Sequence, residues 1–388
     1  MRLLFAACAL ALVIPAADIH AQRAPRRPEL PATADTNDHN AYFQMGMMQV
    51  AKQPSRAADA FYWATRLAPN WGDAYYAHRV ALHLTDSRRF ARYFLGHKAT
   101  VQSKRVREID SLAVEALYRN PFYFARFERM MLDRVVEEVY GPTANVSSRR
   151  TGDAAFDAYI AYSEARFDDA IKYYGDALRR RSRDYALRAP RARAFYHRMM
   201  FDSAANEITI LLEEMRKRDE KQLVYFYDSK AMLEFTLARA YSAQNDTASA
   251  RAALGRALEE DMSFYIAHSE LAEMALASGD TTTALSELAL ATELRGTDVG
   301  VRLRYGDVLS LTGETDDAVE QYRAAIEAEP YFAHPYLRLG IALETLGNQQ
   351  EAAEYYRQFL ARSSRLHSDR ADAESRLARL AQAGDSDN

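Results

Sequence analysis

The sequence predicts an all-α fold built from stacked helix–turn–helix repeats. Composition favours helices, because glycine (15) and proline (11) are scarce among the 388 residues and the strong helix formers Ala, Leu, Arg and Glu are abundant. A further observation is a constant period: alanine recurs at equal steps, at Ala250, Ala284, Ala318 and Ala352. Such a period is typical of arrays in which each unit buries its apolar face against the next.

Three further columns keep the same register. One holds small residues, expected where two helices cross closely; one holds large residues that fill the gaps; one holds residues that tolerate a left-handed turn. In this order the columns are Ala238, Ala272, Gly306 and Gly340; Leu254, Leu288, Tyr322 and Tyr356; and Asn245, Gly279, Gly313 and Gly347. The columns predict four regular units over residues 231–364.

The last unit carries a recognisable signature. Tyr336, Leu339, Gly340, Ala352 and Tyr356 stand at the spacing typical of the tetratricopeptide repeat, which the four units resemble. The resemblance implies a right-handed α-solenoid.

The rest of the chain is less regular. Residues 38–150 read as a helical region with one repeat-like unit followed by irregular, longer helices, and residues 151–230 as two repeat-like units plus an insertion. Residues 365–388 predict a capping helix and a loose tail, and residues 22–37, rich in Pro, Ala and Arg, predict a disordered leader.

Residues 1–21 predict a cleaved signal peptide. The apolar run Leu3–Ala17 follows Arg2, and Ala21 is a small residue of the kind that a signal peptidase accepts. We therefore expect a periplasmic or secreted protein. Cys8, the one cysteine, lies in this segment, so the mature chain would hold no disulfide and no thiolate site. No later stretch is long and apolar enough to span a bilayer.

Motifs for chemistry are missing from the sequence. It has no phosphate-binding glycine loop, no nucleophile elbow and no metalloprotease pair, so we expect neither an enzyme nor a cofactor. None of the nine histidines has a second ligand at helical spacing, so no metal site is expected. The net charge of −4 does not indicate a nucleic-acid partner. The stretch Arg179–Arg193, with seven arginines, either orients a charged partner or forms solvated helix faces.

The resemblance also implies a concave groove lined by the first helix of each unit. On that basis the expected groove residues of the weaker units are Tyr159, Tyr162, Arg193 and Tyr196. In the regular units we expect a charged stripe beside an apolar stripe, a pairing that suits an amphipathic peptide or helix. The charged stripe is Arg239, Glu273, Asp307 and Glu344, and the apolar stripe is Phe235, Ser269, Leu303 and Leu337. Intramolecular packing of the tyrosines is the competing interpretation.

The predicted function is a non-enzymatic scaffold of the cell envelope that binds protein partners through this groove. The alternative is a helper associated with the cell wall or a polysaccharide, which binds glycan or supports an envelope export or synthesis machine. It depends on the aromatic residues at 61–63, 71, 75–76 and 122–124, for which core packing is again the competing explanation.

Overall fold

The structure, a computed structural model, describes residues 25–123, 125–141 and 152–386. The regular structure of these residues is α-helical apart from one short 3-10 helix, and the one β-type contact among them is an isolated bridge between Gln222 and Ser229. The predicted all-α fold is confirmed.

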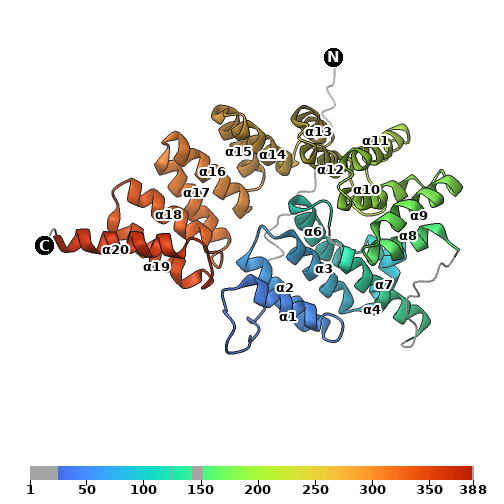
Figure 1. Ribbon diagram of the computed structural model, residues 1–388, viewed down its shortest axis with the longest axis horizontal. Coiled ribbons are helices and arrows are strands. Elements are labelled where there is room, and N and C mark those ends of the chain that lie inside the picture. Colours follow the sequence, from blue (N-terminus) through green and yellow to red (C-terminus); the bar gives the residue numbers. More distant parts are fainter. Residues whose placement is uncertain (1–24, 124, 142–151, 387–388) are drawn as a thin grey trace, which may run out of the picture.

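The helices form two groups, which we call the N-terminal module (α1–α7) and the repeat array (α8–α20) (Figure 1). The module consists of α1 (His39–Gln49), α2 (Pro54–Leu67), α3 (Gly72–Leu84), α4 (Ser87–Phe94), α5 (Lys98–Val101), α6 (Lys104–Arg119) and α7 (Ala125–Tyr140). The array begins with α8 (Ala154–Ser163), α9 (Phe167–Arg180), the 3-10 helix η2 (Tyr185–Leu187), α10 (Arg188–His197) and α11 (Phe201–Lys217). It continues with α12 (Lys230–Ala243), α13 (Thr247–Glu260), α14 (Tyr265–Ala277), α15 (Thr281–Leu294), α16 (Val299–Thr312), α17 (Thr315–Ala328), α18 (His334–Thr345), α19 (Gln349–Arg362) and α20 (Arg370–Ser386).

Local sequence explains where helices of the array begin. Asp246 and Asp280 directly follow the turn of their units, and their carboxylates accept hydrogen bonds from the amides of Ser249 and Thr283, each at 3.0 Å. Each cap satisfies an amide that has no partner within its own helix, which contributes about 1 kcal/mol.

The turn inside each unit is left-handed throughout the array. In the four regular units the φ angle is positive at the predicted column: Asn245 (60°), Gly279 (78°), Gly313 (89°) and Gly347 (82°). Ala165 and Met199 of the two upstream units also have a φ of 57°. A residue with a Cβ costs roughly 1–2 kcal/mol in this conformation. The upstream units therefore keep the turn of the regular units without its favourable residue.

The small and large columns pack against each other. A Cβ placed on Gly306 would lie 2.6 Å from the ring of Tyr322, and one on Gly340 would lie 2.7 Å from the ring of Tyr356. In the two preceding units the small column holds alanine and the large column holds leucine. Glycine therefore accompanies the bulkier tyrosine, because the two positions share one volume.

The irregular part also follows its apolar pattern. The apolar residues that recur at helical spacing on one face of α6 are buried: Val106, Ile109, Ala113, Ala116 and Leu117. The predicted insertion is a longer α11, of 17 residues against 14 for α13, and a connection over residues 218–229. Tyr225 and Tyr227 of this connection reach the N-terminal module, where Tyr225 packs against its core.

The repeat array curves around the N-terminal module (Figure 1). Near one end of α2, Arg66 pairs with Glu329 at 2.5 Å, and the ring of Trp63 lies 4.8 Å from that of Tyr331. The end of α6 contacts the middle of the array, where Tyr118 packs edge-on against the ring of Tyr265 with 5.2 Å between centroids. The module thus occupies the inside of the curve.

Residues 25–37 differ from the predicted disordered leader. They contain no helix, but the indole of Trp63 donates to the Pro25 carbonyl at 3.1 Å, and the side chain of Asn37 donates to the Ala361 carbonyl at 2.8 Å. The Asp35 carboxylate accepts the amide of Arg365 at 2.5 Å. This segment, here called the strap, joins the start of the module to the end of the array. The predicted signal peptide and residues 22–24 lie outside the described residues.

The last helix, α20, covers the end of the array, with Leu377 and Leu380 partly buried against the core of the final units. In the part of the chain that the structure describes, no helix has both the length and the apolar character needed to cross a bilayer.

Candidate functional site

The predicted apolar stripe is not a free surface. Phe235, Leu303 and Leu337 are 0%, 6% and 3% exposed, and Ser269 is buried as well. Phe235 belongs to a core cluster that includes Leu117 of the N-terminal module, whereas Leu303 and Leu337 pack within the core of the last units. The expectation of an exposed apolar stripe is therefore wrong: these side chains are structural.

The predicted groove residues of the weaker units contact the chain itself. The Tyr162 hydroxyl donates to the Tyr123 carbonyl at 3.2 Å, and Arg193 donates to the Tyr123 hydroxyl at 2.8 Å. The rings of Tyr196 and Phe122 stack at 3.6 Å between centroids, and Tyr159 donates to the carboxylate of Glu128. These four residues do share a face, as predicted, but its occupant is the N-terminal module. The competing interpretation, intramolecular packing, describes them correctly.

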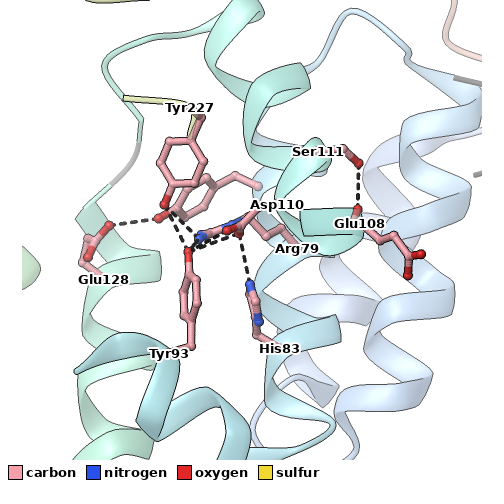
Figure 2. A network of polar contacts seen from close by, with 9 residues as sticks. Arg79, His83, Tyr93, Glu108, Asp110, Ser111, Glu128 and Tyr227 are labelled. Carbon is pink, nitrogen blue, oxygen red and sulfur yellow. Dashed lines mark hydrogen bonds and ion pairs between the residues drawn. The ribbon is translucent and has the colours of Figure 1, made fainter. Parts of the chain in front are cut away.

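A buried polar network links the module to the array (Figure 2). Arg79 of α3 pairs with Asp110 of α6 at 2.7 Å, and Tyr93 of α4 donates to the same carboxylate at 3.0 Å. His83 lies 3.2 Å from that carboxylate, and Arg79 also donates to the hydroxyl of Tyr227, in the connection before α12, at 3.1 Å. Three helices of the module and the distant connection before α12 therefore meet at one ion pair.

The electrostatics of this network are those of a structural pair. Burial by itself would raise the pKa of Asp110, but Arg79 and His83 oppose it, and the pKa lies below its usual value. Burial lowers the pKa of His83. The side chains of Arg79 and Asp110 are 3% and 2% exposed, so solvent and substrates do not reach them. Removing one partner of such a pair typically costs about 3–5 kcal/mol. The ion pair therefore stabilises the module itself, and the hydroxyl of Tyr227 joins it to the array.

The predicted charged stripe exists, but its members are paired between neighbouring units. Glu273 pairs with Arg304 at 3.5 Å, and Asp307 pairs with Arg338 at 3.3 Å. Arg239 and Glu270 make the same contact with the charges exchanged, at 3.1 Å. The two partners of each pair lie on the first helices of consecutive units, so stacking the units brings them together.

Glu344, the last member of the charged stripe, pairs with the capping helix instead of with a neighbouring repeat unit. It lies one helical turn after Ile341, which holds the strict periodic position of the column, and it pairs with Arg376 of the capping helix at 2.9 Å. Each of these half-exposed ion pairs contributes at most about 1 kcal/mol to the stability of the fold. Reversing these acids would therefore place like charges together between units, and we expect it to weaken the stacking as well as any partner contact.

The basic stretch is neutralised in a similar way. Arg188 and Arg191 both donate to Glu207, at 2.8 and 2.7 Å, and Arg181 pairs with Asp153 at 2.8 Å. These arginines therefore pair with acids of their own repeat unit, which does not favour the steering of a partner.

The aromatic residues near the start of the chain are packed inside. Phe61, Trp63, Tyr76 and Phe122 are buried, while Phe124 lies outside the described residues. The exposed aromatic surface on which the glycan-binding alternative depended is therefore not present at these four positions.

An open pocket remains between the last two regular units. It is lined by Asp307, Ser310, Thr315, Tyr322, Arg338, Ile341, Ala342 and Thr345, and its volume is about 210 Å³. The Tyr322 hydroxyl donates to Asp307 at 2.8 Å, and burial raises the pKa of Tyr322, so this hydroxyl stays protonated. Ligand pockets for whole small molecules usually measure about 300–1,000 Å³. The pocket therefore suits one side chain and the adjoining backbone of a bound peptide.

The position of the pocket explains why it is open. The N-terminal module meets this part of the array just ahead of α16 and α18, where Arg119 lies 3.6 Å from Asp298 and Arg66 pairs with Glu329. The pocket lies at the other end of α16 and α18, among Ser310, Ile341 and Thr345. Asp307 is the one residue of this lining that the sequence analysis named as a groove residue, because the tertiary contacts that leave this part of the array uncovered cannot be seen in the sequence.

Comparisons with known proteins are consistent with this geometry. A family model described as a tetratricopeptide repeat-like domain matches residues 186–348, and one described as a tetratricopeptide repeat matches residues 333–364. No curated protein matches the sequence.

Solved structures with a similar course of the chain include that of MamA, at 20% identity and a TM-score of 0.38, covering 44% of this chain and 93% of that one. YrrB, described as a TPR protein with an unusual peptide-binding site, matches at 19% identity and a TM-score of 0.38, covering 48% of this chain and 91% of that one. The C-terminal part of a TPR repeat-containing protein from Cytophaga hutchinsonii matches at 14% identity and a TM-score of 0.44, with coverages of 53% and 78%. Residues 186–364 of the chain therefore consist of tetratricopeptide repeats.

Proposed function

We propose that this protein is a non-enzymatic scaffold of the cell envelope, which binds an extended segment of a partner protein in the open pocket between α16 and α18. The family generally serves in protein–protein interaction, and the pocket is the observation that carries the choice of surface. It offers acceptors and donors (Asp307, Ser310, Arg338) beside the apolar side chain of Ile341. An extended peptide, whose backbone needs hydrogen bonds and whose side chain needs an apolar contact, matches that lining.

Location outside the cytoplasm is part of the proposal and rests on the sequence of residues 1–21. The absence of catalysis is also part of the proposal. It is supported by the missing motifs and by the burial of the Arg79–Asp110 network, the most enzyme-like cluster of the described residues.

The test is site-specific photo-crosslinking in the host. A benzophenone amino acid replaces Thr345, an exposed residue at the mouth of the pocket, or Glu320, an exposed residue of α17 that serves as the control. We expect a protein adduct from position 345 and none of the same mass from position 320. Adducts that are equal at both positions, or none at either, would refute the pocket as the binding site.

A substitution then measures the contribution of the pocket. Thr345→Trp should fill it and weaken binding of the cross-linked partner at least tenfold, whereas Glu320→Trp should leave binding unchanged. Both variants should keep the far-UV circular dichroism and melting temperature of the wild type, because both positions face solvent. Retention of the protein on peptidoglycan or exopolysaccharide, unaffected by Thr345→Trp, would favour the glycan-binding alternative instead.

A further inference from the structure

Three potential metal ligands meet where the array ends. His334 is the first residue of α18, while His367 and Asp369 lie in the link between α19 and α20. One ligand atom of each residue lies within 4.8 Å of those of the other two, and all three residues are half-buried. The spacing in sequence hides this cluster, because α18 and the whole of α19 separate His334 from His367 along the chain.

We propose that His334, His367 and Asp369 bind a divalent transition-metal ion, for which Zn²⁺ is the best match. Imidazole nitrogen and carboxylate oxygen are ligands that zinc prefers, and three protein ligands with one position left for water are common in open zinc sites. Magnesium and calcium favour sites made of oxygen ligands, so a set with two histidines selects against them.

The distances require a small closure around the ion. Ligand atoms at about 2.0–2.2 Å from a tetrahedral zinc lie roughly 3.3–3.6 Å from one another. The three side chains must therefore approach by about 1 Å, a shift that half-buried side chains at a helix start and in a link can make by rotation.

The surroundings already orient the ligands. The Nδ1 atom of His367 accepts the amide of Asp369 at 3.2 Å, which directs its lone pair toward the aspartate, and a bound cation would replace this long hydrogen bond. The ring of Phe359 meets that of His367 edge-on at 5.1 Å. Ser368 donates to one oxygen of Asp369 at 2.9 Å, which leaves the other oxygen for the ion. Such outer contacts fix the orientation of ligands in metal sites.

The neighbouring charges do not exclude a cation. Arg338, one turn after His334, is paired with Asp307 at 3.3 Å, and Arg370 donates to the carbonyl oxygen of Leu360 at 2.7 Å. The strap reaches the same region through Asp35 and Arg365. A metal ion here would connect the last regular unit to the link before the capping helix, next to the contact between Asp35 of the strap and Arg365.

Zinc binding is tested on the full mature chain with its affinity tag removed. Isothermal titration with ZnCl₂ should show one site per chain, and zinc should raise the melting temperature by several degrees, whereas MgCl₂ should do neither. Co²⁺ should give visible d–d absorption bands, which report nitrogen and oxygen ligation at a site of low coordination number. These readouts do not depend on the partner.

Variants assign the site. Asp369→Asn, His334→Ala and His367→Ala should each weaken zinc binding at least tenfold and lose the cobalt bands, while His97→Ala, at an exposed histidine of the N-terminal module, should bind as the wild type does. Asp369→Asn keeps the side-chain size, so its loss of binding is not explained by unfolding. Wild-type zinc affinity in Asp369→Asn and in both histidine variants, or no stoichiometric uptake by the wild type, would overturn the proposal.

Discussion

Gly340 offers a direct test of how the helices of a unit pack. In Gly340→Ala the new Cβ would lie 2.7 Å from the ring of Tyr356, which is fully buried and holds the carboxylate of Glu344 through a hydrogen bond of 2.6 Å. The ring therefore has no free space to enter. Overpacking of this kind typically lowers the free energy of unfolding by about 1–3 kcal/mol, whereas the higher helix propensity of alanine raises it by about 1 kcal/mol. We expect a net loss of unfolding free energy of up to about 2 kcal/mol.

The matched control is Gly255→Ala in α13, where an added Cβ meets no atom within 4 Å. This variant should gain about 1 kcal/mol from helix propensity alone. Urea unfolding followed by far-UV circular dichroism measures both changes. The difference between them, about 1–3 kcal/mol, is the steric cost at Gly340.

A double-mutant cycle with Tyr356→Leu completes the test. Leucine is the residue that accompanies alanine in the first two regular units, as Ala238 and Leu254 show. Tyr356→Leu should be destabilising alone, but Gly340→Ala should cost little in its presence, which gives a coupling energy of about 1–3 kcal/mol. If Gly340→Ala is as stabilising as Gly255→Ala while Tyr356 is present, steric exclusion does not explain the glycine.

Three further substitutions and one sequencing experiment test separate parts of the chain. Ala318→Leu, at a fully buried alanine, should destabilise the array by about 1–3 kcal/mol, and an unchanged melting temperature would show that the register is wrong. Ala165→Gly should raise the unfolding free energy by roughly 1 kcal/mol in urea titrations, because the φ of 57° is strained for alanine; a loss of stability would contradict this. Burial raises the pKa of Asp228 to about 6, above its value in the unfolded chain. The resulting stabilisation is complete below about pH 4 and is lost as the pH rises through 6, so Asp228→Asn should flatten the decline of unfolding free energy between pH 4 and 7. Amino-terminal sequencing of the protein from the host envelope should begin at or near Gln22, whereas a full-length cytoplasmic product would exclude export.

The sequence predicted those parts of the fold that repeat. The constant period places Gly279 and Gly313 in equivalent turns and Gly306 opposite Tyr322, because local conformation and nearest-neighbour packing follow directly from the register. Helical spacing likewise accounts for the buried face of α6.

Contacts between distant segments could not be predicted in this way. No periodic pattern indicates that Tyr227 enters the network around Arg79, or that Phe122 stacks on Tyr196. Tyr162 and Arg193 do lie on the face that the sequence analysis expected. That analysis, however, assumed that no other part of the chain occupies the groove. The proximity of His334 and His367 is hidden for the same reason, because helical spacing can reveal only ligands that lie on one helix.

The N-terminal module occupies the concave face and therefore limits where a partner can bind. At the Arg66–Glu329 contact the module lies ahead of α18, and its removal would expose Trp63 and other core side chains of both parts. Binding that displaced the module would have to offset the loss of the contacts between the two parts, among them the hydrogen bond from Arg79 to Tyr227 and the Arg66–Glu329 ion pair. A partner that binds only the open halves of α16 and α18 avoids this cost, and its affinity then depends on a short contact around Asp307 and Ile341. If the proposed pocket binds a partner, these contacts favour a short peptide segment over a whole helix inserted along the groove.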